Sequence, residues 1–297
     1  MANLLDIRRR IKSVKNTQQI TRAMKMMSAA RLKRAQDRVV AARPFASKML
    51  EVMGDLAART DEEFRHPLLN ARGDERYLLI LVTADRGLCG AFNTNLIKAA
   101  HAFVQENAGK QFEVMPIGRK GRDFFRRRSM EIVNEYIGLM GKGSVGYDEA
   151  VSIASEVIKR FTEDQQLDKV FIIYNEFKSV LQQRVIIEQL LPVSRVSESM
   201  EEADAGPPRE VDMTDYLYEQ EPGEIFSRLL PRVVETQIFR ALLESVASEH
   251  GARMTAMDSA SKNAGELIAS LTLNMNRIRQ AAITNEIIEV VSGAAAL

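Results

Sequence analysis

The chain has 297 residues, of which 45% are hydrophobic and 27% charged, a composition typical of globular proteins with one or two domains. The longest apolar run, Tyr77 to Ala84, is too short to cross a bilayer, and no apolar stretch precedes the first charges, so we expect neither a transmembrane helix nor a secretory signal peptide. The single cysteine, Cys89, excludes an internal disulfide and favours a reducing compartment. His66, His101 and His250 lack metal-ligand spacing.

The net charge of +1 hides an uneven distribution of charge along the chain. Residues 1–53 hold 13 Lys/Arg against 3 Asp/Glu, residues 224–297 hold 7 against 8, and the remainder holds 21 against 29. A basic beginning is therefore followed by an acidic middle.

Helix-breaking residues are scarce at both ends of the chain. No proline precedes Pro44 or follows Pro231, and the first 53 residues contain no glycine. We therefore predict helices over residues 1–60 and 224–297. The second would be about 100 Å long at the usual rise per residue, so it needs a partner for its apolar seam. That seam alternates steps of four and three residues through His250, Met254, Met257, Ser261, Ala264, Ile268, Leu271, Met275, Ile278, Ala282 and Asn285.

The N-terminal segment is the expected antiparallel partner in a long coiled coil. Its seam is apolar at Ile7, Ile11 and Val14 and again at Leu32, Ala35 and Val39. Between these ends the seam positions are polar (Gln18, Thr21, Lys25 and Ser28), and the apolar residues Ile20, Met24 and Met27 lie on a neighbouring face. The sequence leaves two explanations open, a local change of register or a contact outside the coiled coil.

Residues 70–195 alternate strand-like and helix-like segments, which predicts an inserted Rossmann-like α/β domain with a mostly parallel sheet. An acidic linker over residues 196–223 then returns the chain to its last helix. We expect strands at Tyr77–Thr83, Phe112–Ile117, Ile132–Ile137, Lys169–Phe177 and Arg184–Leu191, with helices at Asn95–Gln105, around Asp123–Arg128 and at Asp148–Thr162.

Two loops of this domain contain residues of chemical interest. The sequence GKGSVG at Gly141–Gly146 matches the dinucleotide-binding pattern G-x-G-x-x-G, but it follows the third expected strand and not the first. It supports an alternative function, a dinucleotide-binding α/β enzyme with a coiled-coil arm. The turn TADRGLCG at Thr83–Gly90 has a thiol with no histidine near it in sequence, which favours a structural turn with a buried cysteine.

The basic N-terminal segment suggests a third function, binding to nucleic acid. Its charges surround the predicted helix, and no aromatic residue before Phe45 is available to stack on bases. A solvated or partner-facing basic helix fits these features better.

Three separate blocks, in order, make the chain resemble the gamma subunit of F-type ATP synthase, bacterial type. The first is IRRRIKSVKNTQQITRAMKMMSAARL at Ile7–Leu32, and the second is TADRGLCGAFN at Thr83–Asn93. The third comprises ASEHGARMTAMDSASKNAGELI and RQAAITNEIIEVVSGAAAL in the last helix.

This resemblance implies a central rotor shaft that couples ion-driven rotation of the membrane c-ring to conformational cycling of the catalytic beta subunits. It implies no catalytic residue, cofactor or metal in this chain. The implied partners are the alpha and beta subunits, epsilon, the c-ring and delta, with no nucleic acid and with membrane contact only through the complex. The implied location is the cytoplasmic face of the bacterial inner membrane.

The resemblance also implies which residues contact partners. Contacts with the beta subunits fall on Met24, Arg253, Arg279, Gln280, Thr284 and Glu286. Tyr216, Leu217 and Tyr218 fall near the c-ring and epsilon. The single cysteine departs from the plant chloroplast form, whose extra segment carries a disulfide pair, so redox gating of that kind is not expected.

Overall fold

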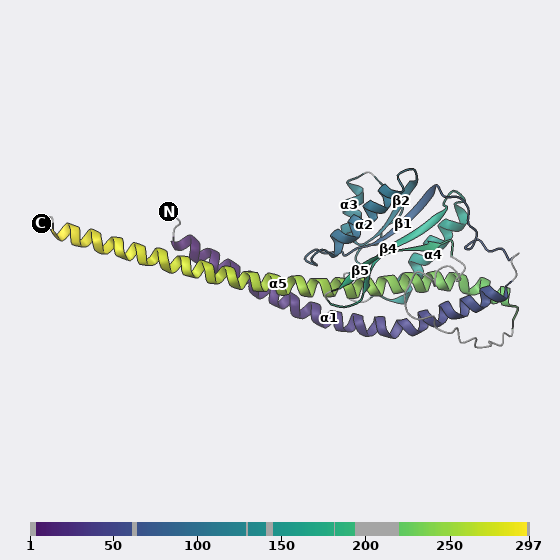
Figure 1. Ribbon diagram of the computed structural model, residues 1–297, viewed down its shortest axis with the longest axis horizontal. Helices are drawn as coiled ribbons and strands as arrows, with labels where there is room; N and C mark the ends of the chain where they lie inside the picture. Colours follow the sequence, from purple (N-terminus) through teal and green to yellow (C-terminus); the bar gives the residue numbers. More distant parts are fainter. Residues whose placement is uncertain are drawn as a thin grey trace. The chain divides into compact units, whose positions relative to one another are not determined.

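The computed structural model of the chain describes residues 4–60, 64–128, 130–140, 145–180, 182–193 and 220–295. Two long helices enclose the rest of the chain in sequence: α1 (Leu4–Arg59) and α5 (Pro222–Ala295). Between them lie β1 (Arg76–Val82), α2 (Phe92–Glu106), β2 (Gln111–Ile117), α3 (Arg119–Arg126), β3 (Glu131–Ile132), α4 (Tyr147–Glu163), β4 (Lys169–Phe177) and β5 (Gln183–Leu191) (Figure 1).

The residues form two compact units, each of which includes part of both long helices. The sheet-containing unit comprises residues 31–252, and the terminal unit comprises residues 1–30 together with residues 253–297. The domain boundaries drawn from the sequence stay a prediction.

The sheet-containing unit is built on five strands in the order β3-β2-β1-β4-β5. The first four pair in parallel, and only β5 is antiparallel, so the predicted mostly parallel sheet is confirmed. The chain crosses from β1 to β2 to β3 in one direction and returns from β3 to β4. Right-handed crossovers therefore place α2 and α3 on one face and α4 on the other (Figure 1).

The third strand is shorter than predicted. The sequence indicated Ile132–Ile137, whereas β3 covers only Glu131–Ile132, with one isolated bridge from Ile117 to Tyr136. This strand lies at the edge of the sheet and pairs only with β2. It therefore has a hydrogen-bonding partner on one side alone, and regular pairing ends early. The apolar pattern of an edge strand predicts its place better than its length.

The core of this unit comes from alternating strand residues. Leu79 and Leu81 of β1 pack with Val114 and Ile173 against the buried face of α2. On α2 that face consists of Phe92, Leu96 and Ala100, at the spacing expected of an amphipathic helix. Residues 77–84 are buried without exception, as expected for a strand covered on both faces.

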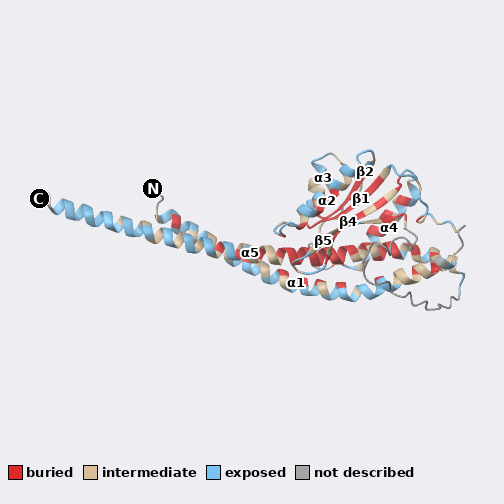
Figure 2. Cartoon of the chain, viewed as in Figure 1, coloured by how far each residue is buried: buried red, intermediate tan, exposed pale blue. Residues whose placement is uncertain are grey.

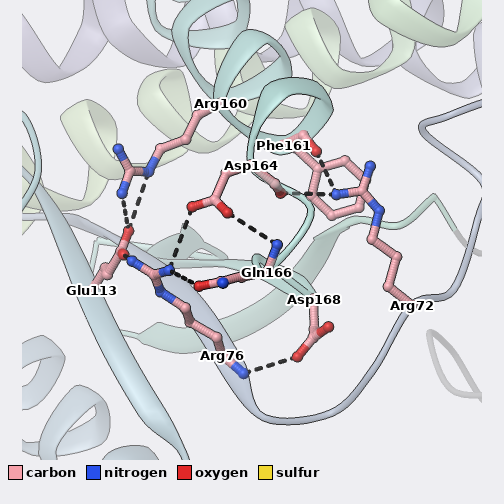
Figure 3. Close-up of polar contacts among 8 residues, drawn as sticks. All are labelled: Arg72, Arg76, Glu113, Arg160, Phe161, Asp164, Gln166 and Asp168. Atoms are coloured by element: carbon pink, nitrogen blue, oxygen red, sulfur yellow. Dashed lines mark hydrogen bonds and ion pairs between the residues drawn. The ribbon is translucent and has the colours of Figure 1, made fainter.

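Two charged clusters fasten the amino-terminal ends of the strands. Glu113 of β2 is buried and accepts hydrogen bonds from Arg76 of β1 and from Arg160 of α4. Asp168, directly before β4, accepts from the backbone N–H groups of Gly73, Glu75 and Arg76 at 2.7–2.9 Å, and Figure 3 shows the bond from Arg76. Two arginine side chains thus satisfy the Glu113 carboxylate and three backbone N–H groups satisfy the Asp168 carboxylate, which allows both to be buried.

Helix α5 is buried on all sides over residues 241–252, where it runs beside β4 (Figure 2). Several of its polar side chains there pair with groups of β4 and α1. Glu244 accepts from the backbone N–H of Phe177 at 2.9 Å and from Arg43 of α1 at 3.2 Å. Ser248 donates to the carbonyl of Asn175. A helix enclosed in this way is typical of a core element.

The long helices pair antiparallel inside each unit. In the sheet-containing unit Arg43 of α1 meets Glu244 of α5. In the terminal unit Lys25 of α1 meets Asp258 of α5, and Gln18 meets Ser261. The predicted antiparallel coiled coil is therefore confirmed.

Candidate functional site

The candidate contact surface for partners lies on the terminal unit, where α1 and α5 pair without a sheet. The α1 positions that are least exposed keep the steps of three and four through the whole unit. They are Leu4, Ile7, Ile11, Val14, Gln18, Thr21, Lys25 and Ser28, with Met24 and Ala29 beside them also partly buried. The seam therefore keeps its heptad register through its polar stretch.

We call Gln18, Thr21, Lys25 and Ser28 the polar window of this seam. The Gln18 side chain donates to the Ser261 carbonyl at 3.2 Å, and Thr21 and Ser28 are buried. Close approach at this level uses small residues on α5, because a Cβ added at Gly265 would lie 3.1 Å from Nε2 of Gln18. Polar side chains thus occupy the seam positions of the coiled coil here, and the heptad register stays the same.

One ion cluster marks the polar window. Lys25 lies 2.6 Å from Oδ1 of Asp258, and Lys262 lies 3.1 Å from Oδ2 of the same carboxylate. The hydrogen bond from Lys25, followed by that from Lys262, holds the pKa of Asp258 below its usual value. The sequence analysis missed this cluster, although the placing of Lys25 on a seam position was a signal for it.

The apolar residues beside the polar window face outward. Ile20 is 59% exposed, Met26 72% and Met27 51%, whereas Met24 is half-buried. A local change of register would have buried Ile20 and Met27 in the seam, so that explanation is wrong. The window instead presents an apolar strip on the surface of this chain, next to exposed basic residues such as Arg22.

The residues expected to contact partners differ in accessibility. Arg279, Gln280, Thr284 and Glu286 are exposed and lie within two turns of α5, and the Thr284 hydroxyl donates to the carbonyl of Gln280 at 2.9 Å. Arg253 is only 8% exposed, so little of it is accessible on this chain alone. Tyr216, Leu217 and Tyr218 lie outside the described residues.

The last part of α5 has no α1 residue beside it. With Gln18 beside Ser261 and antiparallel helices, Leu4 falls beside roughly residue 275 of α5, and α1 begins there. Residues 283–294 are accordingly exposed on every side, including aliphatic residues that a single helix cannot cover. They are Ile283, Ile287, Ile288, Val290 and Val291.

The turn at Thr83–Gly90 is closed by its own hydrogen bonds. The Asn93 side chain accepts from the backbone N–H of Ala84 at 2.9 Å and donates to the Cys89 sulfur at 3.1 Å. Cys89 is buried, as predicted. Gly118 has φ +101°, and a Cβ there would lie 2.0 Å from the Thr83 carbonyl oxygen, so only glycine fits. These contacts describe a structural turn.

Only the end of the glycine-rich loop can be described, because residues 141–144 lie outside the described residues. The loop leads into α4, and the Glu149 carboxylate accepts from the backbone N–H of Gly146 at 2.5 Å. A carboxylate therefore stands at the helix N-terminus, where a dinucleotide would need to place its phosphates. This arrangement disfavours the dinucleotide-binding alternative.

The described residues lack two further features. No group of three or more His, Cys, Asp or Glu side chains there is arranged to hold a metal ion. Among the same residues, no helix has a stretch both long and apolar enough for a membrane span.

The fold defines a class of protein in which an α/β domain is inserted between two long antiparallel helices from opposite ends of the chain. A family model described as ATP synthase matches residues 3–297. The ATP synthase gamma chain of Solibacter usitatus is 52% identical over 100% of this chain and 99% of its own length. That of Desulfitobacterium hafniense is 47% identical over the full length of both chains. The chain belongs to the ATP synthase gamma-chain family.

Solved structures agree with this assignment. A chain of the Tetrahymena thermophila mitochondrial ATP synthase, from its central stalk and c-ring, is 26% identical with a TM-score of 0.58, covering 82% of this chain and 99% of that one. A chain of the Euglena gracilis mitochondrial ATP synthase shares the fold, with a TM-score of 0.68, 20% identity and coverage of 99% and 94%.

Proposed function

We propose that this chain is the central rotor shaft of a bacterial F-type ATP synthase. It couples ion-driven rotation of the c-ring to conformational cycling of the catalytic beta subunits, and it contributes no catalytic residue itself. The observation that carries this proposal is the match to gamma chains along the whole length of both proteins. The fold supports it, since two paired helices can transmit a rotation from one set of partners to another.

We propose that alpha and beta subunits surround the terminal unit, and that the c-ring, epsilon and delta belong to the same complex. The proposed location is the cytoplasmic face of the inner membrane, with membrane contact only through the complex. The exposed aliphatic residues at the end of α5 support a surrounding partner, because isolated surface helices do not usually leave five such side chains uncovered.

The proposed beta-subunit contacts are Met24, Arg253, Arg279, Gln280, Thr284 and Glu286, and Tyr216–Tyr218 are proposed to lie near the c-ring and epsilon. Two features of the surface support the first group. Arg279 and Gln280 present a guanidinium and an amide to solvent, groups able to pair with carboxylate and polar groups of a neighbour. The apolar strip beside the polar window consists of exposed side chains such as Ile20 and Met27. An exposed strip can make apolar contacts with a neighbour without binding it so tightly that rotation stops.

The test is ATP hydrolysis by purified alpha and beta subunits from the same organism, with and without this chain. We expect hydrolysis to rise only when the chain is added, while the chain alone hydrolyses nothing. Circular dichroism of the isolated chain serves as the control for folding. A folded, helical chain that neither assembles with alpha and beta nor raises their activity would contradict the proposal.

A further inference from the structure

A second charged surface lies on the sheet-containing unit, on helix α3, whose first residues donate hydrogen bonds to the Thr83–Gly90 turn. Helix α3 and the two residues after it hold six basic side chains and one acid between Arg119 and Arg128. The surrounding middle part of the chain is acidic as a whole, so this short helix stands against the local charge balance.

Four of these side chains are exposed and make no ion pair with any described residue. They are Arg119, Lys120, Arg126 and Arg127. The other two are engaged: Arg122 pairs with Asp123 and Glu135, and Arg128 lies over the ring of Phe124. Elsewhere in this unit the arginines that fasten the sheet are matched with acids, such as Arg160 with Glu113 and Arg240 with Glu188.

The four free cations lie on one side of α3. Gly121 and Phe125 form its buried face. On a helix with 3.6 residues per turn, Arg119 and Arg126 form one row on the opposite side, and Lys120 and Arg127 form a second row beside it. Each row extends about 10 Å along the helix. Asp123 lies between the rows, and the hydrogen bonds from Arg122 to its Oδ1 are 2.8 and 3.0 Å long.

Local stability does not account for these charges. Arg119 and Lys120 occupy the first turn of α3, where the helix dipole disfavours cations, and that turn contains no acid. Neighbouring cations on one helix also repel one another. Charges that weaken the helix and pair with no acid among the described residues of this unit are available to a partner from outside.

We propose that this side of α3 is a docking surface for an acidic polypeptide segment of a neighbouring subunit. The inference rests on the proposed function, since it assumes a multisubunit assembly. Arginine pairs with carboxylates in a two-pronged geometry, and two rows of cations fit a segment with carboxylates spaced along its length.

The composition of this surface favours a polypeptide over the other anionic partners. No large apolar residue of α3 is exposed, although binding to a lipid surface usually adds apolar insertion to basic charge. No aromatic ring of α3 is presented for base stacking either, because Phe125 is buried and Arg128 covers Phe124.

The test uses photo-crosslinking in membranes that contain the assembled synthase. A photoreactive amino acid replaces Asp123, between the two rows, and mass spectrometry identifies what it captures. A first variant adds Arg119→Gln, Lys120→Gln, Arg126→Gln and Arg127→Gln. A matched variant removes the same charge from four dispersed, exposed positions of the same unit, with Arg65→Gln, Lys98→Gln, Lys159→Gln and Arg184→Gln.

We expect capture of one segment rich in Asp and Glu from another subunit, with a yield at least about fivefold lower in the first variant than in the matched one, because the first variant loses the ion pairs and the electrostatic attraction of the segment. An adduct with the acidic linker of this chain, with lipid or with nucleic acid, capture of a segment without acidic residues, equal yields in both variants, or no capture would each overturn the proposal. ATP hydrolysis by the same membranes reports separately on the proposed function.

Discussion

Two stretches of one helix, α5, show how differently similar sequences are used. Residues 241–252 and residues 283–294 both mix aliphatic with polar side chains, yet the first stretch is buried on every side and the second is exposed on every side (Figure 2). In the first, Glu244 and Ser248 can be buried because backbone groups of β4 pair with them. In the second, no described part of the chain covers the aliphatic residues, which indicates a surface that other subunits cover.

A matched pair of side-chain truncations on α5 tests this difference between the buried and the exposed stretch. Leu242 is fully buried, and Val290 in the second stretch is 72% exposed. We expect Leu242→Ala to lower the free energy of unfolding by about 3 kcal/mol, because it leaves a cavity, and Val290→Ala by less than about 0.5 kcal/mol. Urea unfolding followed by circular dichroism suits this test, because both positions lie on α5 and the signal reports helix along the whole chain. Equal losses for the two variants would contradict the comparison.

The second prediction concerns the carboxylate that fastens the sheet. Burial alone would raise the pKa of Asp168, but hydrogen bonds from the backbone N–H groups of Arg76, Glu75 and Gly73 outweigh burial and lower it. We expect Asp168→Asn to lower the free energy of unfolding by about 2 kcal/mol at neutral pH, since an amide cannot accept all three bonds. Urea unfolding measures the loss, and the exposed neighbour Glu75→Gln is the control, expected to change stability little.

The pH dependence of the same variant has a definite sign. Because the pKa of Asp168 is lower in the folded state, its contribution to stability is complete above about pH 4 and is lost as the pH falls through the folded value. The wild-type chain should therefore lose more stability than Asp168→Asn on acidification below pH 4. Parallel losses in both proteins would show that Asp168 is not the responsible group.

Much of this fold could be predicted because it depends on local periodicity. The continuous apolar run of β1 and the heptad steps in both long helices indicate a buried parallel strand and a coiled coil. The pairing of Glu113 with Arg76 and Arg160 could not be predicted, because 37 and 47 residues separate the partners in sequence and the topology alone brings them together. Tertiary geometry also decided the length of β3.

The candidate site was predictable only in part, for a related reason. Periodicity revealed that positions 18–28 of the seam are polar, but the sequence did not decide between a register change and an external contact. The structure excludes the register change, because Lys25 pairs with Asp258 across the seam in the original register while Ile20 and Met27 are exposed; the external contact stays a prediction. The sequence had no signal that Arg253 would be buried while Arg279 stays exposed.

The third prediction is that a substitution beside the polar window affects coupling in the complex more than the stability of the chain. Met24 is half-buried on the terminal unit, so Met24→Lys should change the free energy of unfolding by less than about 1 kcal/mol. In the assembled complex, however, the new cation would add an ion pair with acidic loops of the beta subunits and retain the rotor there. We expect lower coupling of ATP hydrolysis to ion pumping, measured in vesicles, with Met24→Leu as the control. Equal coupling in Met24→Lys and wild type would rule out this contact.

The smallest expected effect on the isolated chain comes from Arg279→Ala. Arg279 is exposed on α5 beyond the segment that pairs with α1, so its removal should leave the helix content and unfolding of the free chain unchanged. The same change should reduce assembly with alpha and beta subunits, or their ATP hydrolysis, because the guanidinium is proposed to pair with a beta carboxylate. Arg277→Ala, also exposed and one half-turn away, is the matched control for charge and helix propensity. A loss of helicity in Arg279→Ala alone would make this arginine a structural residue. Equal assembly defects in both variants would show that positive charge near the end of α5 matters, and not a particular contact of Arg279.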